Sequence, residues 1–149
     1  MQFVEIDRYF ETNETVLEVL EPCTEIFDRI DEIGGLLRQR SYNNPKEITD
    51  LLQELNGMVN FLKPIDGVAM SAKQENEDRT YNDIKIAILK EDGKVVSAAL
   101  DREASLAVAN YRRVRNVIES YISVCETCII SCQCLLKGQQ SERVATHAS

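Results

Sequence analysis

The sequence predicts an all-α protein, an elongated antiparallel helical hairpin or coiled-coil bundle with additional N-terminal helices. Apolar residues recur at alternating steps of three and four through most of the chain, which places them on one face of a helix. The 149 residues include only 6 Gly and 3 Pro, too few for the frequent turns of a β-sandwich or barrel. The longest apolar runs are a few residues, whereas a membrane helix needs about 20.

Residues 1–41 form a predicted acidic N-terminal helical segment. Thr12 or Asn13 is the expected N-cap of the helix that begins after it, because either side chain can accept a hydrogen bond from a free N–H of that helix's first turn. Pro22 leaves two interpretations open, a kink within one helix or the first residue of a second helix. The apolar face of this segment holds Val16, Leu20, Cys23, Phe27, Ile30, Gly34 and Leu37.

A predicted turn at residues 41–45 separates this apolar face from a second run of regularly spaced apolar residues, here called the second stripe. Asn44 is the expected cap of the helix that follows, and Pro45 is expected at its first position. The stripe continues through Pro64, which favours one bent helix. Residues 73–80 have no apolar face, so a solvated helix and a loop are both open there. The stripe holds Ile48, Leu51, Leu55, Met58, Leu62, Ile65, Ala69 and Ala72, and the signal returns at Tyr81, Ile84 and Ile88.

The pair Asp92-Gly93 marks the strongest turn, and we place it at 92–94 in a helical hairpin that covers residues 42–137. Gly93 can adopt positive φ without steric cost, which suits a helix end followed by a reversal. Asp-Gly also occurs in strand hairpins, so a small β-hairpin from Ile86 to Val96 is the alternative. The flanking residues do not alternate cleanly, which favours helices.

The third stripe predicts one helix over about residues 97–137, roughly 60 Å long at 1.5 Å per residue. We expect Gly138 to end this helix and residues 138–149 to form a polar tail. Its seam follows a 4-3 alternation from Leu100 through Ala104 and Ala107 to Leu135. Because one short chain cannot hide so long a seam, we expect a homo-oligomer. The predicted oligomer interface is Tyr111, Val114, Ile118, Tyr121, Cys125, Cys128, Cys132 and Leu135.

Residues suited to enzyme chemistry are scarce, so we expect no catalytic activity, no cofactor and no metal. Four of the five cysteines lie between Cys125 and Cys134, and three of them share the helical seam, which favours core packing. Zinc held across subunits is the alternative. The single histidine, His147, lies near the end of the sequence, which argues against triad chemistry. Gly34-Gly35 lacks the Lys-Ser or Lys-Thr of a phosphate loop.

The compartment is predicted from the N-terminus and the thiols. Residues 1–7 lack the basic and apolar regions of a signal peptide. An odd number of clustered cysteines is typical of free thiols in a reducing compartment. We therefore expect a cytoplasmic protein.

Charge is distributed unevenly along the chain. The formal net charge is −8, and residues 5–32 hold ten acidic side chains against Arg8 and Arg29. Cations concentrate later, and the candidate nucleic-acid contacts are Lys85, Lys90, Lys94, Arg112, Arg113 and Arg115. Tyr81 and Tyr111 could provide stacking platforms for bases. The alternative is a solvated helix surface whose cations pair with neighbouring acids.

Three segments carry a family resemblance: Tyr81–Ala87 before the turn, and Asp101–Ala104 and Tyr111–Arg115 after it. With the heptad tail that follows, they resemble helical-hairpin accessory proteins of tailed bacteriophages, and within that group UvsY-type recombination mediators. The resemblance implies an oligomer that binds single-stranded DNA and helps a recombinase to displace single-strand-binding protein. It further implies that Lys85 and Lys90 contact the DNA.

Two hypotheses of different class follow for function. The first is a recombination mediator, which predicts salt-sensitive binding to single-stranded DNA that charge reversal at Lys85 or Arg112 weakens. The second is an assembly, adaptor or virion structural protein that contacts only proteins. It predicts stable oligomers and no binding to oligonucleotides at moderate salt.

Overall fold

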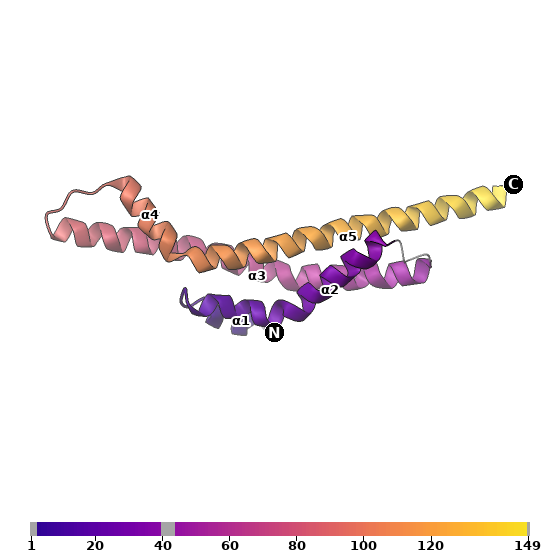
Figure 1. Ribbon diagram of the computed structural model, residues 1–149, viewed down its shortest axis with the longest axis horizontal. Coiled ribbons are helices and arrows are strands. Elements are labelled where there is room, and N and C mark those ends of the chain that lie inside the picture. Colours follow the sequence, from indigo (N-terminus) through magenta and orange to yellow (C-terminus); the bar gives the residue numbers. More distant parts are fainter. Residues whose placement is uncertain (1–2, 40–43, 149) are drawn as a thin grey trace. The chain divides into compact units, whose positions relative to one another are not determined.

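The computed structural model describes residues 3–39 and 44–148, and these residues contain helices and no strand (Figure 1). The all-α prediction is confirmed, while the hairpin geometry stays a prediction. The elements are α1 (Phe3–Tyr9), the 3-10 helix η1 (Thr15–Val19), α2 (Leu20–Arg38), α3 (Pro45–Lys90), α4 (Ser97–Ala107) and α5 (Ala109–Ala148).

The chain divides into two compact units, each built from segments that are distant in sequence. Unit 1 combines the N-terminal residues up to Pro22 with Ile65–Ile118. Unit 2 combines Cys23–Pro64 with the chain from Glu119 onward.

The N-terminal helices follow most of the predicted stripe, but Val19 and Ile33 are buried where Leu20 and Gly34 were expected. Thr12 serves as a cap, because its Oγ1 accepts a hydrogen bond from the Thr15 N–H at 3.1 Å. Pro22 lies in the first turn of α2, where a missing N–H leaves no helical hydrogen bond unmade. Val19 is buried in place of the predicted Leu20, since a 3-10 helix has three residues per turn and Val19 follows Val16 by three.

Helix α3 begins as the sequence predicts. Pro45 is its first residue, and the Asn44 Oδ1 accepts a hydrogen bond from the Lys46 N–H at 2.9 Å. The first part of the predicted turn, residues 41–43, lies outside the described residues. Helix α3 continues through Pro64 and through residues 73–80, so the solvated-helix interpretation of that stretch is confirmed.

The end of α3 differs from prediction in which residue takes the left-handed conformation. Helix α3 extends to Lys90, so the β-hairpin alternative is wrong. Asp92 has φ 54°, and no glycine in the described chain has positive φ. The Asp92 N–H donates to the Leu89 carbonyl at 3.3 Å, and the Gly93 N–H donates to the Ile88 carbonyl at 3.0 Å. These two bonds form a Schellman cap with Asp92 at the αL position.

The predicted single helix over 97–137 begins at Ser97 as expected, but it is interrupted at Val108 and extends beyond residue 137. The chain leaves helical geometry at Val108, with φ −110° and ψ 20°, and this residue separates α4 from α5. Helix α5 does not end at Gly138 but continues to Ala148, so the described part of the predicted polar tail is helical. Gly138 carries no turn because a helical glycine costs only about 1 kcal/mol relative to alanine.

Both units have apolar cores, and none of the described side chains in them is both buried and polar or charged. In unit 1 the buried residues include Phe10, Val16, Val19, Ile65, Ala69, Leu100, Ala104, Val108, Tyr111, Val114 and Ile118. In unit 2 they include Cys23, Phe27, Ile30, Ile33, Ile48, Leu51, Leu55, Leu62, Ile122, Cys125, Cys128 and Cys132.

Candidate functional site

Most of the predicted oligomer interface is covered within a single chain. Six of its eight residues are at most 6% exposed, namely Tyr111, Val114, Ile118, Cys125, Cys128 and Cys132. Tyr121 is half-buried, and its ring stacks on Phe27 with centroids 4.2 Å apart. Leu135 is 40% exposed and is the member that an outside partner can reach most readily. The chain's own helices cover the six buried positions, and an interface there stays a prediction.

Residues of α2 and α3 provide that cover in unit 2. The Cys125 thiol donates a hydrogen bond to the Leu55 carbonyl oxygen at 3.3 Å. Lys63 of α3 forms an ion pair with Glu126 of α5 at 3.2 Å. The helices therefore meet through both apolar and polar contacts, and the seam from Cys125 to Cys132 is hidden by the chain's own helices.

The buried cysteines pack as apolar side chains. Cys23, Cys125, Cys128 and Cys132 are buried, and Cys134 is exposed. Burial raises the pKa of the Cys23 and Cys125 thiols to about 11, so both stay protonated near neutral pH. The described residues contain no group of three or more His, Cys, Asp or Glu side chains that could hold a metal ion.

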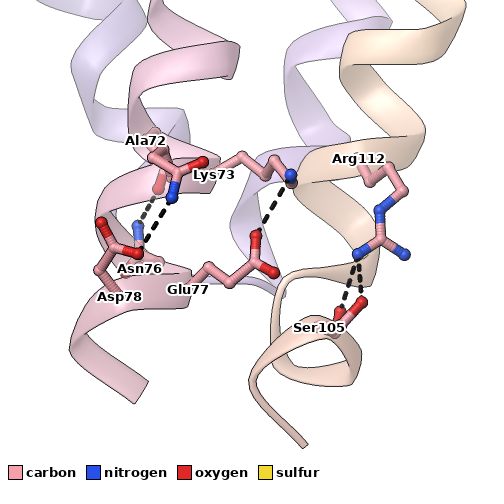
Figure 2. A network of polar contacts seen from close by, with 8 residues as sticks. Ala72, Lys73, Asn76, Glu77, Asp78, Ser105 and Arg112 are labelled. Atoms are coloured by element: carbon pink, nitrogen blue, oxygen red, sulfur yellow. Dashed lines mark hydrogen bonds and ion pairs between the residues drawn. The ribbon is translucent and has the colours of Figure 1, made fainter. Parts of the chain in front are cut away.

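One of the predicted DNA contacts, Arg112, is engaged within the protein. Its Nη2 donates to the Ser105 carbonyl oxygen at 3.2 Å and to the Ser105 hydroxyl at 2.5 Å (Figure 2). The Ser105 carbonyl belongs to the last turn of α4, where carbonyls lack helical donors. Arg112 therefore caps α4, and a cation is favourable at that end of a helix dipole.

A half-buried ion pair on α3 borders the same region. Lys73 and Glu77, 3.2 Å apart, point from α3 toward the segment that carries Ser105 and Arg112 (Figure 2). Their side chains are only 20% and 26% exposed. Charged groups thus surround the end of α4 without forming an open cationic surface.

The remaining predicted DNA contacts do not form one continuous strip. Lys85, Lys90, Lys94 and Arg113 are exposed, and Arg115 is half-buried. Arg79 lies close enough to Tyr111 to lower the pKa of its phenol, against the larger effect of burial, which raises it. Lys90 is eleven residues beyond Arg79, or about 16 Å along the helix. Lys90 therefore lies well beyond the part of α3 that faces the start of α5.

The group near the turn also carries no excess of positive charge. Between residues 81 and 96, the charges of three lysines are balanced by those of three acidic side chains, Asp83, Glu91 and Asp92. Three large apolar side chains in the same stretch, Ile86, Leu89 and Val96, are more than half exposed. Phosphate contacts supply most of the affinity of nonspecific nucleic-acid binding. A neutral surface of this kind is therefore a weak electrostatic match for DNA.

Unit 2 contains a groove that sequence reasoning missed. Its volume is about 1260 Å³, larger than the roughly 300–1,000 Å³ of small-molecule sites. One wall comes from the end of α2, with Gly34, Leu37 and Arg38, and Pro45 of α3 lies beside it. The other wall is one face of α5, which includes Val124, Thr127, Cys128, Ser131, Cys134, Leu135, Gly138 and Glu142.

A sequence signal for this groove does exist in α5. Small residues follow a strict 4-3 alternation at Thr127, Ser131, Cys134, Gly138, Ser141 and Ala145. This second stripe is distinct from the buried one and shares its period. Small side chains allow the backbone of another helix to approach closely. A search for hydrophobic periodicity alone does not reveal a stripe of small, mostly polar residues.

The last part of α5 is exposed along its length. From Gln133 to Ala148 each residue is exposed except Leu136 and Gln139, which are half-buried. Val144 is 69% exposed, and Ile130, one turn before this stretch, is 59% exposed. Helices of this length are only marginally stable alone in water. This end of α5 therefore gains most from a partner.

No family model, curated protein or solved structure matches the chain. None of the described helices is both long and apolar enough to cross a membrane. Function is therefore inferred from the surfaces that the two units present.

Proposed function

We propose that the protein is a non-enzymatic, self-associating helical accessory protein. The contact surface is the groove of unit 2 together with the exposed end of α5, residues 133–148. The single observation that carries the proposal is that this helical end is exposed on nearly every side and borders a large groove.

A second copy of the chain is the occupant that fits this surface. Each copy offers both a groove and an exposed helix, so two copies can exchange the same contacts about a two-fold axis. The stripe of small residues provides the close approach that such helix pairing needs, while Leu135 and Val144 supply exposed apolar area. Arg38, Arg143 and Glu142 line the groove and offer charges of both signs to a partner with the same sequence.

Two glycines provide a matched pair of variants for this proposal. A Cβ atom on Gly138 or on Gly57 would meet no atom within 4 Å, so both helices tolerate a larger side chain. Gly138 lines the groove, whereas Gly57 is an exposed residue of α3 outside its lining. Gly138→Leu should therefore fill the groove without disturbing the fold, and Gly57→Leu serves as the control.

Sedimentation equilibrium over a range of concentrations provides the readout. We expect the wild type and Gly57→Leu to have a mass above that of the 16.9 kDa chain, and Gly138→Leu to sediment as a monomer. A monomeric wild type would refute self-association. Equal association of all three proteins would refute the groove as its site. A co-purified foreign helical protein that Gly138→Leu fails to bind would replace the second copy as occupant.

A second candidate function is the recombination mediator that binds single-stranded DNA. Its support is the exposure of Lys85, Lys90, Lys94 and Arg113 together with the family resemblance. Fluorescence anisotropy with a labelled oligonucleotide at two salt concentrations tests it. The mediator hypothesis predicts salt-sensitive binding that Lys85→Glu weakens and that Lys46→Glu, an exposed control in unit 2, leaves unchanged.

Arg112 is unsuitable for that experiment. Charge reversal there would remove the cap on Ser105 as well as any contact with DNA. Absence of binding at moderate salt would exclude the mediator hypothesis and leave the protein-contact proposal standing.

A further inference from the structure

The break between α4 and α5 has no local cause in the sequence. The chain from residue 97 to 137 contains neither proline nor glycine, the residues that usually interrupt helices. Residues Leu100, Ala104, Ala107 and Tyr111 would share one face of an uninterrupted helix. In the structure Ala107 is exposed and Val108 is buried instead, at 1% exposure. The break therefore shifts the buried register by one residue.

The N-terminus of α5 is capped by Asn13, which belongs to the N-terminal segment of unit 1. The Asn13 Oδ1 accepts a hydrogen bond from the Asn110 backbone N–H at 3.2 Å. The Asn110 side-chain amide donates in return to the Asn13 carbonyl oxygen at 2.8 Å. A helix normally receives this bond from its own N-cap residue, so Asn13 replaces a cap that the α5 sequence lacks.

Tyr111 adds a second attachment next to the first. Its hydroxyl donates to the Phe10 carbonyl oxygen at 2.9 Å in a buried setting, and the two rings lie 6.4 Å apart. Burial raises the pKa of the Tyr111 phenol, so the hydroxyl keeps its proton across the neutral range. Residues 10–15 are themselves held in a turn by hydrogen bonds between Thr12 and Thr15.

An uninterrupted helix would satisfy the same backbone groups without outside help. In it the Asn110 N–H would bond to the Leu106 carbonyl, four residues earlier. The Ser105 carbonyl would likewise find a helical donor and no longer need Arg112. The broken form therefore depends on contacts that the sequence near Val108 does not supply.

We propose that residues 10–15 act as a strap that holds the break at Val108, and that release of the strap fuses α4 and α5 into one helix. Fusion moves Ala107 into the buried register and turns Val108 outward. A protein partner that captures the strap would thereby change the surface of unit 1. This switch is independent of the groove in unit 2 and of self-association.

Two substitutions at Asn13 compare loss of the hydrogen-bond acceptor with a change that keeps it. Asn13→Ala removes the acceptor for the Asn110 N–H, whereas Asn13→Asp keeps an acceptor oxygen and adds a charge that a helix N-terminus favours. The readout is the NMR Cα chemical shift of Val108, which reports whether that residue is helical. We expect the wild type and Asn13→Asp to be non-helical there, and Asn13→Ala to shift the equilibrium about fivefold toward helix, the effect of one hydrogen bond.

Tyr111→Phe provides an independent variant, because it removes the bond to Phe10 and keeps the ring. We expect it to shift Val108 in the same direction as Asn13→Ala, and the double variant to shift it further. Unchanged chemical shifts in unit 2, for example at Ile48, show that the protein is folded. A folded double variant in which Val108 stays non-helical would overturn the strap.

Discussion

The turn after α3 gives the sharpest test of local geometry, because two adjacent substitutions should have opposite effects. Asp92 holds φ at 54°, a conformation that costs most L-residues about 1–2 kcal/mol and costs glycine nothing. Asp92→Gly should therefore remove this cost. After the extra entropy of glycine in the unfolded chain is subtracted, we expect a gain of about 0.5 kcal/mol in the free energy of unfolding.

Gly93→Ala should act in the opposite direction. A Cβ on Gly93 would lie 2.9 Å from Ile88 Cγ2 and 3.1 Å from the Ile88 carbonyl oxygen. The carbonyl is backbone and also accepts the bond from the Gly93 N–H, so the cap must shift. Forced overpacking of this kind costs about 1–3 kcal/mol.

Urea unfolding followed by circular dichroism measures both changes. Gly57→Ala is the control, since it adds a Cβ in open space within a helix and should stabilise by up to about 1 kcal/mol. If Gly93→Ala were neutral and Asp92→Gly destabilised the protein, neither the close approach at Gly93 nor the left-handed φ at Asp92 would hold. The assignment of the left-handed position to Asp92 would then be refuted.

Three further predictions concern thiols and an ion pair. Native protein should react rapidly with a thiol reagent at Cys134 alone, and unfolded protein at all five cysteines; fast reaction at a second site would contradict the packing. The raised pKa of Cys23 and Cys125 means that only the unfolded state loses these protons between pH 9 and about 11. Stability should fall there by about 1.4 kcal/mol per pH unit for each thiol, and Cys125→Ala should reduce the slope. Arg29 donates to both Glu54 oxygens, at 2.5 and 2.9 Å, and holds the pKa of Glu54 low. Because both side chains are about one-third or more exposed, Glu54→Gln should cost no more than about 1 kcal/mol at pH 7, and less as pH falls below 4.5.

Features set by neighbouring residues could be predicted from the sequence. Asn44 and Pro45 mark the start of α3, because a cap and a fixed φ act within one turn. The continuation of α3 through Pro64 also follows from local spacing, since apolar residues on both sides keep one face. The core positions of α3 from Ile48 to Ala69 were correct for the same reason.

Features set by distant residues could not be predicted. The break at Val108 depends on Asn13, which lies 97 residues from Asn110 in sequence. In unit 2, the contacts of Cys125 and Tyr121 with Leu55 and Phe27 depend on how α2 and α3 pack against α5. Periodicity shows that a seam must be covered, but it does not tell which residues cover it.

Hydrogen exchange over residues 133–148 tests the central claim most directly, because these residues carry the proposed contact between copies. Amides in this part of α5 should exchange slowly at high protein concentration and markedly faster on dilution, while peptides from Ile48 to Leu62 stay protected throughout. Fast exchange of residues 133–148 at every concentration would mean that no second copy covers them and would contradict the proposed function.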